Sequence, residues 1–301
     1  MITLRARPCA PPPGRLCESP VWDSRTDELV WVDIRGGHIH RAALDRATLD
    51  LTVRSTVSMP PPVSAVVPCA SGGLLATAGD TISRIDADGT TTRLAAIPLP
   101  DDGIRRRLND AKADPHGRLF AGTMSEDGIQ GSAALYRLDP DGALNTLRDG
   151  VTISNGIDWS PDGTVLYYVD SPTKKVEAFE YDITTGTFGE GRPFARFADG
   201  EPDGLTVDGE GWVWVAVWGA GQVHAFDPIG QRRAIIEVGP SQVSSCVFAG
   251  PDLDVLVITT AAEGKAADEP DAGRLFACVP GAVGLPGTPY ADAGLVRTDG
   301  R

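Results

Sequence analysis

Short apolar runs separated by turns recur along the whole chain. Six of them are rich in valine, leucine, tryptophan, tyrosine and threonine, which favour β-strands: ELVWVD (28–33), LLATAG (74–79), RLFAGT (118–123), TVLYYVD (164–170), WVWVAVW (212–218) and DVLVITT (254–260). Each run follows a turn rich in Gly, Asp, Ser or Pro, which supply the backbone angles of tight turns. No window shows the period of an amphipathic helix, so the pattern predicts an all-β protein.

Two more segments follow each run. The first kind alternates apolar and polar residues, as expected of partly exposed strands: HIHRAALD (38–45), TISRIDAD (81–88), ALYRLDPD (134–141), VEAFEYD (176–182), QVHAFDP (222–228) and GRLFACV (273–279). The second kind is less regular: LTVRST (51–56), TTRLAA (91–96), ALNTLRD (143–149), GRPFARF (191–197), RRAIIEV (232–238) and the C-terminal GLVRTD (294–299).

A further segment precedes each run, and its first residue recurs at a nearly constant interval. These residues are Glu18, Ser64, Asn109, Asn155, Asp203 and Ser245, with gaps of 46, 45, 46, 48 and 42 residues. A period of this length indicates one supersecondary unit built repeatedly. Four strands in six units predict a six-bladed β-propeller with four-stranded antiparallel blades, a single domain spanning residues 1–301. A β-sandwich or two β-domains would not give six evenly spaced units.

The recurring position opens the innermost strand of each predicted blade, so its six residues should ring one mouth of a central channel. Two of them are carboxylates, two are amides and none is a large hydrophobe. Glu18, Asn155 and Asp203 together offer two negative charges and a carbonyl oxygen, the donors that hard divalent cations prefer. The ring therefore predicts a cation site with open coordination positions.

Composition excludes several classes of partner. The chain has 41 acidic and 27 basic residues and a formal net charge of −14, which disfavours nucleic acid as a partner. No run reaches the roughly 20 apolar residues of a membrane helix. The N-terminal segment also lacks the apolar run of a secretory signal, so we expect a cytoplasmic protein without membrane contact. Its five cysteines form no CxxC motif and are expected to be free thiols.

Two charged groups lie close to the predicted ring in sequence. Arg107 precedes Asn109 by two residues, so strand alternation places it on the same face, where it can donate hydrogen bonds to a polyhydroxylated or anionic ligand. After the run RLFAGT come Ser125, Glu126 and Asp127, a second acidic cluster at one end of the same blade.

Several longer segments resemble the regucalcin and gluconolactonase family. They are CESPVWD (17–23), LVWVDI (29–34), RLNDAKADPHGRLFAGTM (107–124), ISNGIDWSPDGTVLYYVDS (153–171), AFEYD (178–182), PDGLTVDGEGWVWVA (202–216) and AGRLF (272–276). The resemblance covers nearly the whole chain in order and with similar spacing. It implies a six-bladed propeller with a divalent cation in the central channel and hydrolysis of aldonolactones.

Carried over position by position, the resemblance implies Glu18, Asn155 and Asp203 as metal ligands. It implies Arg107 and Asn109 as contacts for the sugar lactone. A Glu often follows the AGTM strand in the family as a further substrate contact, and here that register gives Asp127, with Glu126 beside it.

The expected reaction is opening of a sugar lactone to the aldonic acid by a metal-dependent carboxylic ester hydrolase. One divalent cation (calcium, zinc, manganese, magnesium or ferrous iron) would stabilise the oxyanion, and Asp203 is the candidate for removing the proton of the attacking water. Alternatively, the cation itself acidifies this water. The protein is expected to act as a monomer or weak homo-oligomer in carbohydrate metabolism.

Two other functions fit the predicted fold. One is a cation- or ligand-binding regulatory propeller without turnover. The other is an arylesterase-like propeller, which would need an apolar mouth and a histidine base, and none of the six ring positions is a histidine.

Overall fold

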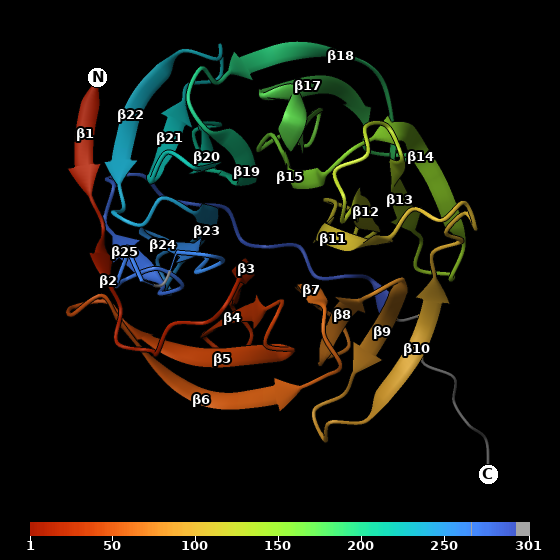
Figure 1. Ribbon diagram of the computed structural model, residues 1–301, viewed down its shortest axis with the longest axis horizontal. Coiled ribbons are helices and arrows are strands. Elements are labelled where there is room, and N and C mark those ends of the chain that lie inside the picture. The colour runs from red at the N-terminus through yellow and green to blue at the C-terminus, as the bar shows by residue number, and fades with distance from the viewer. Residues whose placement is uncertain (266, 293–301) are drawn as a thin grey trace.

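Six antiparallel sheets of four core strands surround a central axis, which confirms the predicted six-bladed β-propeller (Figure 1). The computed structural model describes residues 1–265 and 267–292. The first three blades comprise β3 (Cys17–Asp23), β4 (Glu28–Asp33), β5 (His38–Asp45) and β6 (Asp50–Ser58); β7 (Val63–Pro68), β8 (Leu74–Ala78), β9 (Thr81–Ile85) and β10 (Thr91–Ala96); and β11 (Arg106–Ala113), β12 (Leu119–Ser125), β13 (Ala133–Leu138) and β14 (Leu144–Val151).

The next two blades follow the same order from the axis outward. They comprise β15 (Ser154–Trp159), β16 (Val165–Asp170), β17 (Lys175–Asp182) and β18 (Thr187–Arg196); and β19 (Glu201–Val207), β20 (Val213–Trp218), β21 (Gln222–Phe226) and β22 (Arg232–Glu237). A short 3-10 helix, η1 (Ser171–Thr173), is the one helix among the described residues and joins β16 to β17.

The sixth blade is completed by an N-terminal strand. This blade contains β23 (Val243–Ala249), β24 (Val255–Thr260), β25 (Phe276–Cys278) and, as its outermost strand, the N-terminal β2 (Arg7–Pro8). We expected GLVRTD (294–299) to be the last strand, but these residues lie outside the described part of the chain and β2 fills that place. The preceding strand, β1 (Ile2–Arg5), adds in parallel to β22 as a fifth strand of the fifth blade. The first eight residues therefore link two blades.

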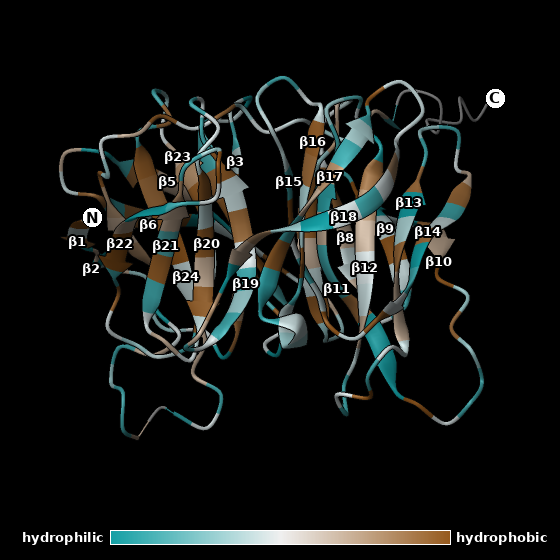
Figure 2. Cartoon of the chain, turned by 90° about the horizontal axis from the view of Figure 1, so that it is seen from above, coloured by the Kyte–Doolittle hydropathy of each residue, from teal (hydrophilic) through white to brown (hydrophobic). Residues whose placement is uncertain are grey.

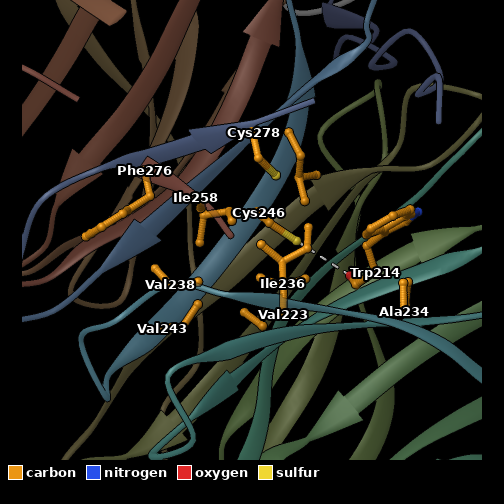
Figure 3. Close-up of a cluster of buried hydrophobic side chains, with 14 of the residues drawn as sticks. Trp214, Val223, Ala234, Ile236, Val238, Val243, Cys246, Ile258, Phe276 and Cys278 are labelled. Atoms are coloured by element: carbon orange, nitrogen blue, oxygen red, sulfur yellow. Dashed lines mark hydrogen bonds between the residues drawn. The ribbon is translucent and has the colours of Figure 1, made fainter. Parts of the chain in front are cut away.

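Hydrophobic side chains gather between neighbouring blades. Figure 2 shows the middle strands β16 and β20 as largely hydrophobic, and their residues are mostly buried. One such cluster joins the last two blades, where Trp214 and Ile236 of the fifth lie among Ile258 and Phe276 of the sixth (Figure 3). Burial of each large apolar side chain contributes about 1.5–3 kcal/mol. These contacts hold the blades in a ring. All five cysteines are buried and free, as expected.

The innermost strands approach one another closely where each carries a β-bulge. The pairing register with the second strand shifts at this place in all six blades, between Glu18 and Val21, Val63 and Ala65, Leu108 and Ala111, Ser154 and Ile157, Pro202 and Leu205, and Val243 and Ser245. A bulge changes the direction of the side chains next to it. The close approach of the strands is clear at Gly156, which follows the ring residue Asn155: a Cβ there would lie 2.5 Å from the carbonyl oxygen of Asp203.

A C-terminal segment, residues 283–292, crosses the far end of the channel, and we call it the strap. It appears in Figure 1 as the blue coil running across the centre. The Gly209 amide donates to the carbonyl of Val283 (2.8 Å), and the strap's Tyr290 and Ala291 amides donate to Pro68 and Gly117 (2.8 Å each). The strap therefore ties the fifth blade to the second and third. Beneath it lies a cavity of about 300 Å³, lined partly by Lys112, Asp158 and Trp159.

Among the residues that the structure describes, no helix is long and apolar enough to cross a membrane.

Truncation should separate the roles of the two N-terminal strands. Removing residues 2–5 deletes β1 and leaves every blade with four strands, whereas removing residues 2–8 also opens the sixth blade at β25. We expect a small fall in melting temperature for the first variant. A much larger fall is expected for the second, since it exposes a buried sheet edge. Differential scanning calorimetry of the two truncated proteins measures this, and equal melting temperatures would contradict closure by β2.

Candidate metal and substrate site

The ring of polar residues lies at the bulges of the six innermost strands, as the repeat predicted, with two corrections of register. In the first blade Glu18 is the last regularly paired residue before the bulge, opposite Val32, so Ser19 rather than Glu18 is equivalent to Asn155. In the second blade the Ser64 hydroxyl bonds that of Thr77 at 2.8 Å. In the sixth blade it is Ser244, not Ser245, that makes the corresponding bond, with Thr259 at 2.8 Å. The register shifts agree, because Ser64 and Ser244 are the extra residues of their bulges. The sequence alignment was thus wrong by one residue here, and Ser245 instead lines the cavity beneath the strap.

Glu18 is buried at the ring and held by its own backbone. The amide of Ser19 donates to Glu18 Oε2 at 2.7 Å. Ser19 has φ 47°, a left-handed conformation that a non-glycine residue adopts at some cost in energy. Burial raises the pKa of Glu18, and the carboxylate of Asp110 raises it further. The protein therefore holds this carboxylate in a place where its charge is unfavourable.

Asp203 lies in the same environment and has an unused oxygen. Its Oδ1 is buried without a hydrogen-bond partner. Burial raises the pKa of Asp203 well above its ordinary value, and the charges of Glu18 and Asp110 add to this effect. A buried carboxylate oxygen without a donor is costly unless a cation or a proton compensates it. Asp203 and Glu18 therefore fit a bound cation on their own chemistry.

The amide of Asn155 is oriented by a chain of hydrogen bonds. Its Nδ2 donates to Ser171 Oγ at 2.9 Å, and Ser171 Oγ donates to the carbonyl of Pro202 at 2.7 Å. This fixes the amide with Oδ1 toward the ring, where it accepts from Asn109 Nδ2 at 3.2 Å. Ser171 belongs to η1, so this short helix acts as the support for Asn155. Sequence reasoning missed Ser171, because its link to Asn155 depends on the three-dimensional course of β16.

Arg107 and Asn109 lie next to this group, as strand alternation predicted. Arg107 Nη1 donates to Asn109 Oδ1 at 2.8 Å and to the carbonyl of Leu108 at 2.9 Å. Asn109 Nδ2 also donates to the carbonyl of Ser154 at 2.8 Å. The Nε of Arg107 is buried without a partner. The guanidinium is thus fixed on one edge and has a free donor on another.

The acidic residues after β12 divide their contacts. Asp127 is exposed and accepts from Arg105 Nη2 at 2.6 Å, on the outer side of the mouth. Glu126 is less exposed, and its Oε1 lies 4.0 Å from Arg107 Nε. Of the two acids, the structure places Glu126 beside the ring and Asp127 away from it.

Asp110 is a further, half-buried carboxylate that the sequence did not single out. It follows Asn109 in the bulge, and burial raises its pKa while the nearby ammonium of Lys112 lowers it. Lys112 Nζ in turn bonds Asp158 Oδ2 at 2.5 Å. The sequence signal for Asp110 was its place directly after Asn109. An Asn-Asp pair is typical of a turn, so this signal indicates a site residue only once the bulge is known.

Charge in this part of the channel is unbalanced. When ionised, four carboxylates (Glu18, Asp110, Asp158 and Asp203) face two cations (Arg107 and Lys112) with two negative charges in excess, and the raised pKa values of Glu18, Asp110 and Asp203 show that the cation-free protein resists this state. Among the described residues, no three His, Cys, Asp or Glu side chains gather closely enough to hold a metal by themselves. A cation at Glu18 and Asp203 would therefore need the amide oxygen of Asn155, and a divalent one would balance the charge.

Comparison with known proteins agrees with this architecture. The family model described as "SMP-30/Gluconolactonase/LRE-like region" matches residues 16–262. A protein of Bacillus subtilis provisionally named sugar lactone lactonase YvrE is 36% identical over 283 residues, covering 91% of this chain and 94% of the relative. Human regucalcin is 35% identical over 307 residues, covering 98% of this chain and all of the relative (100%).

Solved structures show the same fold. A calcium-binding regucalcin of Agrobacterium tumefaciens superposes with a TM-score of 0.86 at 28% identity, covering 96% of this chain and 98% of the other. A luciferin-regenerating enzyme superposes with a TM-score of 0.83 at 26% identity, covering 93% and 96%. On the family model and the extent of these similarities, the chain belongs to the SMP-30/gluconolactonase/LRE-like family.

Proposed function

We propose that this protein hydrolyses a sugar lactone with the help of one divalent cation held by Glu18, Asn155 and Asp203. The observation that carries the proposal is the buried Asp203 carboxylate, which has an oxygen without a partner and lies in a channel with excess negative charge. Relatives named as lactonases make lactone opening the reaction to test first. When bound, the cation would supply Lewis-acid polarisation of the lactone carbonyl.

The residues of the chain have separate roles in this reaction. Arg107 offers its free Nε to an oxygen of the substrate, and its contacts with Asn109 and Leu108 keep it in place. Asn109 is held by the carbonyl of Ser154, so both groups are preorganised. Asp203 is the base candidate for the attacking water; binding the cation lowers its basicity, so the alternative is that the cation itself acidifies this water. Glu126, rather than Asp127, is the acid placed to accept a hydrogen bond from a substrate hydroxyl.

A second candidate is a cation-binding protein without turnover. It is favoured by the similarity to a calcium-binding regucalcin, which shares 28% identity with this chain. It needs the same three ligands but no role for Arg107. Hydrolysis assays therefore separate the two functions, whereas cation binding alone does not.

Lactone opening is expected to depend on both the cation and Asp203. We expect the purified protein to release acid from an aldonolactone in a pH-indicator assay. Chelation should remove at least about 90% of this activity and re-added divalent cation should restore it. Asp203→Ala should lower kcat by roughly a thousandfold or more with saturating cation present. Undiminished activity of this variant would contradict both roles of Asp203, and cation binding without hydrolysis would favour the second candidate.

Asp203→Asn should have opposite effects on stability with and without the cation. Because burial and like charges raise the pKa of Glu18 and Asp203, their ionisation destabilises the cation-free fold, and this cost grows as the pH rises above the ordinary carboxyl range. The variant should thus melt at a higher temperature than the cation-free wild type, with a difference larger near pH 8 than near pH 5. Added cation should stabilise only the wild type. A lower melting temperature of the cation-free variant at pH 8 would contradict the crowding of negative charge.

Ser171→Ala should weaken cation binding without touching a ligand. Loss of the hydroxyl frees the Asn155 amide to turn its Nδ2 toward the ring. We expect about tenfold weaker binding by isothermal titration calorimetry, as is typical for loss of a group that orients a ligand. Ser160→Ala is the control, since Ser160 is in the same blade and bonds only the turn at Asp162 and Val165. Equal affinities of the two variants would exclude a positioning role for Ser171.

A further inference from the structure

Three guanidinium groups gather at the open mouth of the channel, although the chain as a whole is strongly acidic. Arg107 belongs to β11, Arg105 directly precedes this strand, and Arg35 follows β4 of the first blade. All three lie within 4.0 Å of the carboxylate of Glu126. Residues far apart in sequence thus place three guanidiniums, together with the acids that pair with them, on the same side of the site.

Arg35 and Arg107 lie close enough to repel each other. Burial lowers the pKa of Arg107 to about 10, and the charge of Arg35 is the next largest cause. Arg107 is 4% exposed and its Nε has no hydrogen-bond partner. Two cations held together, one of them desolvated, are unfavourable unless an anion joins them.

The protein supplies only a loose anion between them. Glu126 Oε1 lies 3.6 Å from Arg35 Nη1 and 4.0 Å from Arg107 Nε, which are too long for hydrogen bonds. The other oxygen of Glu126 bonds Arg105 Nη1 at 3.2 Å, so Glu126 has a second partner to which it can turn. Arg35 keeps Nη1 on this side, because its Nε is paired with Glu263 Oε1 at 2.9 Å. A ligand carboxylate between the two guanidiniums would make the short, charge-assisted bonds that Glu126 does not.

We propose that the substrate is a lactone with a free carboxylate, a monolactone of an aldaric acid, whose carboxylate binds between Arg35 and Arg107. The inference rests on the proposed lactone hydrolysis and narrows its substrate. A water adds across the ring ester, the acyl C–O bond breaks, and the ring oxygen leaves as a hydroxyl. The monoanionic lactone becomes a dicarboxylate and one proton is released. A neutral aldonolactone offers only hydroxyls to the guanidinium pair, which leaves their repulsion to be offset by the nearby carboxylates of Glu126, Glu263 and Glu18 alone.

A matched pair of substrates tests the inference. The five-membered-ring lactones of gluconic and glucaric acid differ only in the terminal group, which is CH₂OH in the first and carboxylate in the second. We expect wild-type kcat/KM to be at least about tenfold higher for the glucaric lactone, a factor that one charged contact can supply. Added salt should reduce this preference, because it screens charges near the surface.

Variants of Arg35 assign the preference to a residue. Arg35→Gln should lower the ratio of the two kcat/KM values by about tenfold, and Arg35→Lys should retain part of it. Arg46→Gln is the control, since Arg46 is also a surface arginine in an ion pair, with Asp254, but lies outside this site. It should leave the ratio at the wild-type value.

The outcomes separate this inference from the proposed function. A wild-type preference for the gluconic lactone, or an equal loss on both lactones in Arg35→Gln, would overturn the carboxylate site and leave lactone hydrolysis standing. No hydrolysis of either lactone by the cation-loaded wild type would overturn the proposed function and the carboxylate site with it. Melting temperatures of the Arg35 variants equal to that of the wild type would show that a change in ratio does not come from unfolding.

Discussion

The close approach of the innermost strands is the constraint on which the site depends. There is no room for a Cβ at Gly156, and one at Gly204 would lie 2.8 Å from Cα of Ser245. Glycine weakens a strand interior, so its use directly after the ring residues of two successive blades has a local stability cost. In return, the polar side chains just before these glycines converge on the axis. The geometry that concentrates oxygen atoms is thus a backbone property, and the side chains follow from it.

Because the carboxylates converge, their ionisation is unfavourable in the cation-free protein, and a bound cation relieves this cost. Burial raises the pKa of Glu18 and Asp203, the charge of Asp110 raises both further, and the charge of Glu18 adds to the effect on Asp203. Apolar contacts between blades, such as the T-shaped pair of Trp214 and Phe248 at 5.6 Å, supply the stability that allows such crowding. Cation binding therefore releases more free energy at this crowded, negatively charged site than it would at an uncharged site. The same logic operates at the mouth with the opposite sign, where guanidiniums lie together.

The sequence predicted the fold well because the propeller repeats itself. Six units with the same turn and strand pattern fixed the number of blades, and the polar residue opening each inner strand pointed to the ring. Register was less secure: a bulge adds one residue to the inner strand, so Ser244 and Ser245 could not be told apart by spacing. Contacts between segments distant in the chain could not be predicted from the sequence. Ser171 supports Asn155 across a turn, Arg35 meets Arg107 from another blade, and Arg105 draws Asp127 away from the ring.

Closure of the sixth blade by β2 has a consequence for biosynthesis. β2 (Arg7–Pro8) is synthesised long before its partner β25 (Phe276–Cys278). At typical synthesis rates the interval between them is roughly 15–50 s. During this time β2 lacks its partner strand, and the early blades form an open arc with one uncovered flank. The sixth blade can therefore close only when β25 pairs with the much earlier β2. Until then the exposed strand edges are where chaperone binding would matter most.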